Sequence, residues 1–179
     1  TEFANSSIGA CTTTGTMTEY PVTSGQRPYS ICAGPDSNLW YTQWTTGNTN
    51  GGVGRIDVTG SFTDFPISGS TYSVVGICTG PDGKIWTGEY TTSSIYKYET
   101  SGTFTAYPVG VSGRGIGFGA GPDGNVWFSA YDANRVGYIT PSGTQVFYPQ
   151  PTAGTEIYNT DINQLQMYNG TAWVNVSGE

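Results

Sequence analysis

One nine-residue phrase occurs three times along this chain, and it constrains the fold more than any other feature. The copies read CAGPDSNLW, CTGPDGKIW and GAGPDGNVW, and they begin at residues 32, 78 and 119. A repeat of about 40–45 residues is the size of one four-stranded propeller blade. The sequence therefore predicts an all-β propeller built from copies of one unit.

Each unit is expected to contain four strands. The first leads into the Gly-Pro-Asp turn, where proline presets φ and a following glycine accepts a positive φ. The second carries the tryptophan, and the fourth ends in an aromatic residue followed by proline, which suits an outer edge. The second strands are expected at 39–42, 85–88 and 126–129, the third at 53–56, 95–98 and 136–139, and the fourth at 62–67, 104–109 and 145–149.

The N-terminal end of the chain matches only the outer half of the unit. Residues 7–11 correspond to a third strand and residues 15–22 to a fourth. Four outer halves therefore accompany three inner halves. A propeller closed by one sheet made from both termini has this arrangement.

The C-terminal residues lack the Gly-Pro-Asp phrase but have strand character at 155–160 and 165–176. Asn169-Gly170 within the second range is a strong hairpin-turn signal. We expect a small propeller of about four blades, closed by pairing of N- and C-terminal strands. In this organisation residues 1–150 form the repeats, and residues 151–179 form a C-terminal β-hairpin segment for closure or for contact with a neighbouring subunit.

Composition argues against several classes of partner. The net charge is −7 with only six lysines and arginines, whereas a nucleic-acid surface needs clustered basic residues. No apolar run is long enough to span a membrane. We expect no nucleic-acid partner and no membrane insertion, and the low lysine content favours an extracellular or virion-surface location. Because the first residue is Thr1, we expect a processed chain or part of a longer one.

The three cysteines admit two interpretations. Cys32 and Cys78 share one repeat position, and Cys11 falls at the strand position of Ile56. One disulfide and one free thiol is the first interpretation. Three small hydrophobic side chains without a disulfide is the second, and it is favoured because cysteine often packs in this way.

The repeated aspartates and tryptophans also have a functional and a structural interpretation. The aspartates of the three turns, Asp36, Asp82 and Asp123, are candidate cation ligands, but single carboxylates on separate blades make a poor calcium cage. A role in the turn itself is favoured, because aspartate bonds its own backbone there. The tryptophans, Trp40, Trp86 and Trp127, are interpreted as core wedges between blades rather than as a ligand platform.

The candidate ligand-binding residues lie at the ends of second strands and near the starts of first strands, where loops carry function. Together they are expected to line one mouth of the central channel and to suit sugar or peptide recognition. They are Tyr29, Gln43, Trp44, Tyr72, Glu89, Tyr90, Arg114, Tyr131 and Asp132. No catalytic residue is predicted, because acid–base chemistry needs a poised pair of groups. No metal site and no cofactor are expected.

The phrase GPDGNVWF at 121–128, followed by NRVGYITP at 134–141, resembles the repeats of the streptogramin B (virginiamycin B) lyase family. The resemblance covers about residues 7–149 and implies a β-propeller, although the blade count expected here falls short of that family's. It also implies a histidine base and a magnesium ion held by carboxylates. Since the chain contains no histidine, that base has no counterpart, and we expect no lyase activity.

Residues 157–174 resemble a short terminal module common in phage tail-fibre and other virion proteins. This resemblance implies a repurposed propeller. We expect a non-enzymatic structural or attachment protein of a virion appendage or an extracellular assembly. Its partners would be copies of itself or other structural subunits, and a surface glycan. The alternatives are a secreted glycan- or peptide-binding module and, less favoured, a divergent lyase.

Overall fold

The computed structural model describes residues 6–22, 26–45, 51–67, 74–90, 93–109, 115–148, 156–159, 164–168 and 172–175. The secondary structure of these residues is all β. The chain divides into two compact units, Thr1–Phe147 and Tyr148–Glu179, and each is described by itself. In the part of the chain that the structure describes, no helix has the length and apolar character needed to cross a bilayer.

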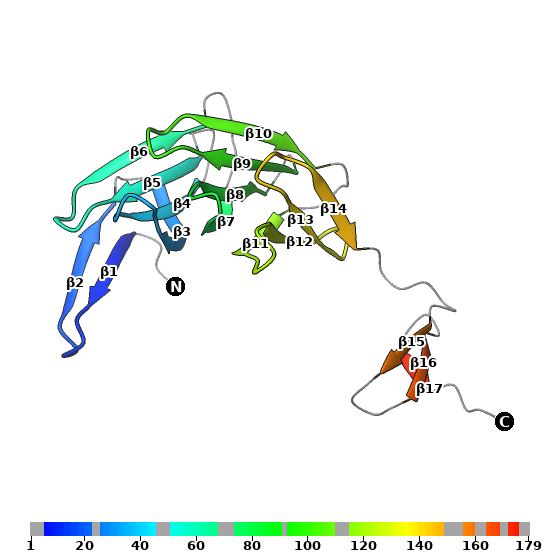
Figure 1. The fold of residues 1–179 in the computed structure, drawn as a ribbon. Helices are drawn as coiled ribbons and strands as arrows, with labels where there is room; N and C mark the ends of the chain where they lie inside the picture. Colours follow the sequence, from blue (N-terminus) through cyan, green and yellow to red (C-terminus); the bar gives the residue numbers. More distant parts are fainter. Residues whose placement is uncertain are drawn as a thin grey trace. The chain divides into compact units, whose positions relative to one another are not determined.

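Three four-stranded antiparallel sheets form most of the first unit, as the repeat predicts (Figure 1). The first sheet contains β3 (Gln26–Ala33), β4 (Leu39–Thr45), β5 (Gly52–Ile56) and β6 (Phe62–Pro66). The second contains β7 (Val74–Thr79), β8 (Ile85–Glu89), β9 (Ser94–Tyr98) and β10 (Phe104–Pro108). The third contains β11 (Gly115–Ala120), β12 (Val126–Ala130), β13 (Arg135–Ile139) and β14 (Gln145–Tyr148). In each sheet the strands follow one another in sequence order.

A two-stranded hairpin precedes these sheets. Strand β1 (Ser7–Cys11) pairs with β2 (Met17–Pro21) over their full lengths, from Ser7 opposite Pro21 to Cys11 opposite Met17. The hairpin therefore has the outer two strands of a blade, as the sequence predicts. Its apolar side packs on the first sheet through a core of Ile8, Tyr41 and Ile56.

The second unit is a three-stranded antiparallel sheet of β15 (Glu156–Asn159), β16 (Gln164–Tyr168) and β17 (Trp173–Asn175). Strand β15 pairs with β16, and β16 pairs with β17. The predicted turn at Asn169-Gly170 lies outside the described residues. The predicted pairing of this segment with residues 7–22, and with it the closure of the propeller, stays a prediction.

The core of the first unit lies between consecutive sheets. One cluster joins the first and second sheets and contains Trp40, Val53, Ile77 and Ile85, all buried. A second cluster joins the second and third sheets through Trp86, Ile95, Val126 and Phe128, among others. Strands β4 and β8 are pleated, so successive side chains of each strand point to opposite faces of its sheet. These side chains therefore reach the neighbours on both sides. The order along the unit is hairpin, first sheet, second sheet and third sheet, with the hairpin and the third sheet at opposite ends (Figure 1).

An aromatic side chain from the last strand of the hairpin, of the first sheet and of the second sheet packs on the blade that follows. Phe65 of β6 packs against Gly102, and Tyr107 of β10 packs against Gly143, so closely that a Cβ on either glycine would overlap the ring. The hairpin repeats the contact through Tyr20, which covers Gly60. These glycines have φ values of 93°, 97° and 90°, respectively, which also favour glycine. Each joint between blades is thus built from the same pair of parts.

The innermost strands share an irregularity at one place. The pairing of first with second strands shifts at a bulge between Pro28 and Ile31, and equivalent bulges occur in the second and third sheets. In the first and third sheets a hydroxyl two residues after the repeat tryptophan bonds the backbone there: Ser30 N donates to Thr42 Oγ1 at 3.0 Å, and Gly117 N donates to Ser129 Oγ at 3.0 Å. In the second sheet Thr87, directly after Trp86, donates from its hydroxyl to the carbonyl of Gly76. Bulges re-aim side chains, and here the bulge positions Tyr29.

Candidate functional site

The turn aspartates hold the repeat tryptophans. Trp86 Nε1 donates to Asp82 Oδ1 at 2.9 Å, and the same bond joins Trp40 to Asp36 at 2.9 Å. The same Oδ1 atoms accept from the backbone N–H two residues further on, as at Lys84. In the third sheet Trp127 Nε1 donates to Asp123 Oδ1 at 3.0 Å. The turn interpretation of these aspartates agrees with this geometry, because one oxygen of each carboxylate is already used within its own blade.

The tryptophans themselves serve as wedges in two of the three blades. Trp40 and Trp86 are completely buried, each in the cluster between its own sheet and the next. Trp127 is only partly buried. We call the side of a blade that faces the next blade along the chain its forward side. Equivalent sequence positions have different exposure because this side is buried only where a further blade packs on it.

A cation lies over the first two tryptophans and links each blade to the next. The guanidinium of Arg55 is 5.8 Å from the Trp40 ring centroid and forms an ion pair of 3.2 Å with Asp36. It also donates to the carbonyl of Thr100 in the following blade at 3.4 Å. Lys97 repeats the arrangement over Trp86 and donates to a carbonyl of the third sheet, that of Pro141, at 2.9 Å. These contacts are structural rather than part of an open site.

Three of the predicted ligand-binding residues form one aromatic cluster. The rings of Tyr29 and Trp44 are stacked, with centroids 5.9 Å apart and planes at 30°. Tyr90, at the end of β8, meets Trp44 edge to face, with centroids 5.1 Å apart and planes at 64°. Tyr29 is 63% exposed, and the other two rings are partly exposed. The aromatic cluster, defined here as Tyr29, Trp44 and Tyr90, spans the ends of two blades.

Trp44, Tyr90 and Tyr131 occupy one repeat position, four residues after each repeat tryptophan. Tyr131 is 67% exposed and lies in the turn after β12, together with the exposed Asp132. The repeat thus places one aromatic side chain at the same end of all three second strands. Tyr72 and Arg114, the remaining predicted residues near first-strand starts, lie outside the described residues.

The polar residues just before these aromatics are buried. Gln43 and Glu89 are both 0% exposed, whereas the prediction had them lining the channel mouth. Gln43 Nε2 donates to Gln26 Oε1 at 3.2 Å and to Asp64 Oδ1 at 2.5 Å. Its carbonyl oxygen is buried without a hydrogen-bond partner among the described residues. Gln43 therefore supports the sheet below the aromatic cluster.

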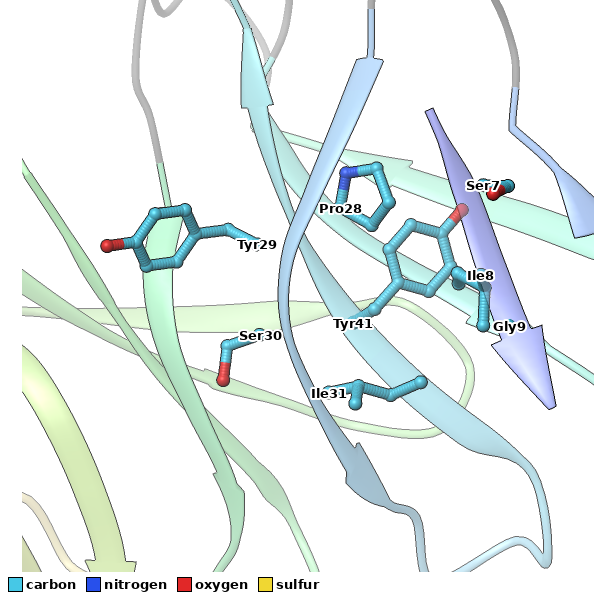
Figure 2. Close-up of a pocket in the computed structure, with 8 residues that line it drawn as sticks. All are labelled: Ser7, Ile8, Gly9, Pro28, Tyr29, Ser30, Ile31 and Tyr41. Carbon is cyan, nitrogen blue, oxygen red and sulfur yellow. The ribbon is translucent and has the colours of Figure 1, made fainter. Parts of the chain in front are cut away.

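A small hollow separates the hairpin from the first sheet (Figure 2). Ser7, Ile8 and Gly9 of β1 line one side and Pro28 of β3 the other, with Tyr41 between them. Tyr29 also belongs to the lining of the hollow, although its ring extends to the opposite side of β3 (Figure 2). Burial and the nearby carboxylate of Asp64 raise the pKa of Tyr41. The hollow and the ring of Tyr29 therefore lie on the two sides of one strand, and Tyr29 is common to the hollow and the aromatic cluster.

The described residues contain no group of three or more cysteine, aspartate or glutamate side chains that could hold a metal ion. The cysteines are free thiols: Cys11 is exposed, Cys32 is partly buried and Cys78 is buried. The disulfide interpretation is therefore not the arrangement found. Burial, together with the nearby Cys32 and Asp82, raises the pKa of Cys78 to about 12.

Comparison with known families places this architecture. The model of the Virginiamycin B lyase family matches residues 43–164, which is more than half of the chain. The chain belongs to this family. The match begins on β4 and includes the second and third sheets. A search of the curated proteins found no match. Nothing in the comparisons supports the resemblance of residues 157–174 to virion proteins.

Solved structures show the same fold. A streptogramin B lyase superposes with a TM-score of 0.75 at 22% identity, covering 97% of this chain and 63% of that one. Virginiamycin B lyase from Staphylococcus aureus has a TM-score of 0.73 at 27% identity, covering 92% of this chain and 56% of that one. A catalytically inactive histidine-to-alanine variant of the Staphylococcus aureus enzyme, with quinupristin, has a TM-score of 0.55 at 22% identity, covering 92% and 70%. This chain spans less than two thirds of the length of the first two lyases.

The sequence reasoning missed the residues that hold the blades together. The hydroxyls of Thr42 and Ser129 recur two residues after their repeat tryptophans, so alignment of the repeats would have found these two, whereas Thr87 directly follows Trp86 and shares no repeat position with them. Arg55 and Lys97 also share one repeat position, with Tyr138 as the third member. Their bonds to the following blade carry no separate sequence signal, since the acceptors are backbone carbonyls.

Proposed function

We propose that this chain is a non-enzymatic structural or attachment protein of a virion appendage or an extracellular assembly, built on a propeller of the lyase family. The observation that carries the proposal is the aromatic cluster of Tyr29, Trp44 and Tyr90, which offers partly exposed rings across two blades. The proposed partners are other copies or structural subunits, and a surface glycan. The proposed location is the virion surface or the extracellular space.

The absence of histidine supports a non-enzymatic role. The variant of the Staphylococcus aureus lyase that lacks one histidine is described as catalytically inactive. No other side-chain type supplies an unperturbed base that titrates near neutral pH, as imidazole does. A divergent lyase would need a different base, and the carboxylate beside the aromatic cluster, Glu89, is completely buried.

The chemistry of the aromatic cluster suits a sugar. A ring that is partly buried on one side and open on the other presents a rigid apolar face at little cost in conformational entropy. The apolar faces of pyranose rings can lie flat on such a surface, with their hydroxyls directed to solvent and to nearby polar groups. A peptide with an apolar or proline-rich stretch is the second candidate, because aromatic grooves also bind such segments.

A binding screen on glycan and peptide arrays tests the proposal, followed by titration calorimetry with the best ligand. We expect a glycan to bind and Trp44→Ala to lose the binding with little change in melting temperature. Tyr138→Ala is the matched control, because this partly buried ring contacts Trp127 in the third sheet instead. Binding of peptides alone would favour the second candidate. No binding on either array, or equal loss in both variants, would contradict a recognition role for the cluster.

For the fold itself, we propose that the C-terminal segment completes the first blade. Among the described residues the hairpin has the outer two strands of a four-stranded sheet and no inner strands, and the hollow in Figure 2 lies between β1 and β3. Unpaired strand edges favour the addition of further strands. Residues 155–176 supply strands for this position, either from the same chain or from a neighbouring subunit. The mass of the native particle would show whether the chain works within an assembly.

A further inference from the structure

In the first and second sheets, the forward side carries buried residues at two equivalent repeat positions, and in the third sheet these positions are more exposed. Trp40 and Trp86 are 0% exposed, and so are Val53 and Ile95 on the neighbouring third strands. In the third sheet the equivalent residues are Trp127 and Val136. Trp127 is partly exposed, and Val136 is 50% exposed. Both residues line a shallow open hollow, and these two residues define the front surface.

The hairpin exposes the other side of this type of interface, the side that a blade presents to the blade before it. In the first sheet, Ile56 and Phe62 face backward into the core shared with the hairpin. The equivalent residues of the hairpin, aligned by strand register, are Cys11 and Met17. Cys11 is exposed and Met17 is 64% exposed. These two residues and Gly15 define the rear surface.

Gly15 gives the clearest evidence that the rear surface resembles one side of an interface between blades. It has the turn geometry of Gly60, Gly102 and Gly143, with φ of 87°. Those three glycines are each covered by an aromatic ring of the preceding blade, whereas a Cβ at Gly15 would meet no atom of the described residues within 4 Å. Gly15 therefore has the backbone geometry of a glycine that an aromatic ring covers. In the described residues, open space lies where that ring is found at the other three glycines.

We propose that the front surface of one molecule packs against the rear surface of a second copy, head to tail. The front surface repeats what the first and second sheets present to their successors, and the rear surface repeats what the first to third sheets present to their predecessors. The contact would continue, between molecules, the interface that already joins the hairpin and three sheets within one chain. Apolar area now exposed at Met17, Trp127 and Val136 would be buried.

A head-to-tail contact uses two different surfaces, so it leaves one free surface of each kind at the ends of any pair. Such heterologous contacts grow into closed rings or open filaments, whereas an isologous contact stops at two copies. The proposal deepens the structural part of the proposed function by naming the partner, and it rests on that part alone. It does not use the aromatic cluster, and it excludes a ring closed within one chain, because such a ring would place the front surface against the rear surface of the same molecule.

The test measures mass by sedimentation over a wide range of protein concentration, with the full chain. We expect the average mass of the wild type to rise with concentration. Met17→Asp should block the rear surface and Val136→Asp the front surface, and each variant alone should stay a single chain. Val58→Asp is the matched control, because Val58 is 89% exposed on a turn between β5 and β6. Met17→Ser and Val136→Ser serve as milder exchanges, and each variant's melting temperature shows whether it is folded.

Mixing the two blocked variants decides the geometry. Met17→Asp keeps its front surface and Val136→Asp keeps its rear surface, so the mixture should form complexes of two chains and no larger. A mixture that stays monomeric, a wild type of constant mass, or association that survives both single variants would overturn the proposal. Loss of association only on deletion of residues 149–179 would also overturn it, since the occupant would be the C-terminal unit. Glycan binding by monomeric variants would be unaffected, so a failure here is distinct from a failure of the ligand proposal.

Discussion

Trp86 donates a hydrogen bond of 2.9 Å from its indole Nε1 to Oδ1 of Asp82, four residues before it. The bond spans the Gly-Pro-Asp turn and joins a turn residue to a core wedge. Gly80, which opens the turn, lies against the same indole, and a Cβ there would overlap the ring. The repeated phrase is therefore one physical unit in which glycine makes room for the indole and aspartate satisfies its N–H group. A buried indole donor needs such a partner.

Replacing Trp86 with alanine should destabilise the first unit strongly. The side chain is 0% exposed in the cluster between the second and third sheets. Loss of a fully buried aromatic side chain leaves a cavity and costs about 3–5 kcal/mol. Trp127→Ala is the matched control with a smaller expected loss, because Trp127 is partly exposed. Urea unfolding followed by circular dichroism measures both; equal losses would contradict the difference in burial.

The stability of the fold should depend on the charge of Asp36 at acid pH. Burial raises the pKa of Asp36, but hydrogen bonds from Asn38, Trp40 and Arg55 outweigh it and hold the pKa below its ordinary value. A carboxyl of lowered pKa stabilises the fold above its unfolded pKa of about 3.9 and loses that contribution as pH falls through the folded value. The free energy of unfolding should therefore fall below about pH 4. Asp36→Asn should make this fall shallower; an unchanged slope would show that Asp36 contributes no linkage.

The three thiols should differ in reactivity. Cys11 is exposed, whereas burial first, and then Cys32 and Asp82, raise the pKa of Cys78 to about 12. Because the thiolate is the reactive form, Cys78 should resist an aromatic disulfide reagent in the native protein. We expect one fast thiol, lost in Cys11→Ser, and reaction of all three after denaturation. A chain mass two hydrogens lower would instead reveal a disulfide.

The chain should have no streptogramin lyase activity. Family membership predicts the propeller, but a sequence without histidine has no imidazole to act as a base. An assay with quinupristin and magnesium should give no turnover above the uncatalysed rate. The Staphylococcus aureus enzyme is the positive control. Turnover that follows the protein through purification would show that another residue supplies the base.

Deletion of residues 155–179 tests the closure of the first blade. If these strands complete the hairpin sheet, the truncated chain should melt at a lower temperature or lose its assembled state, because the edge of β1 would be left unpaired. Thermal melts and sedimentation of the truncated and full chains make the comparison. An unchanged melting temperature and mass would show that the second unit is an independent appendage.

The candidate site was only partly predictable. The repeat identified the aromatic positions Trp44 and Tyr90, because residues at one repeat position end up at one end of neighbouring blades. It could not show that Gln43 and Glu89 point inward, since a strand reverses its side chains at every residue and the bulge opposite shifts the register. The stacking of Tyr29 on Trp44 depends on that bulge too.

The sequence by itself determined the repeating blade, its strand order and the Gly-Pro-Asp turn, because local turn chemistry and alternation act over a few residues. Only the tertiary structure decided which equivalent residues are buried. Trp40, Trp86 and Trp127 occupy one position in the repeat, yet the first two are enclosed and the third is partly open. Burial depends on whether a further blade packs on the same side, and that is a property of neighbours distant in sequence, which no single repeat contains.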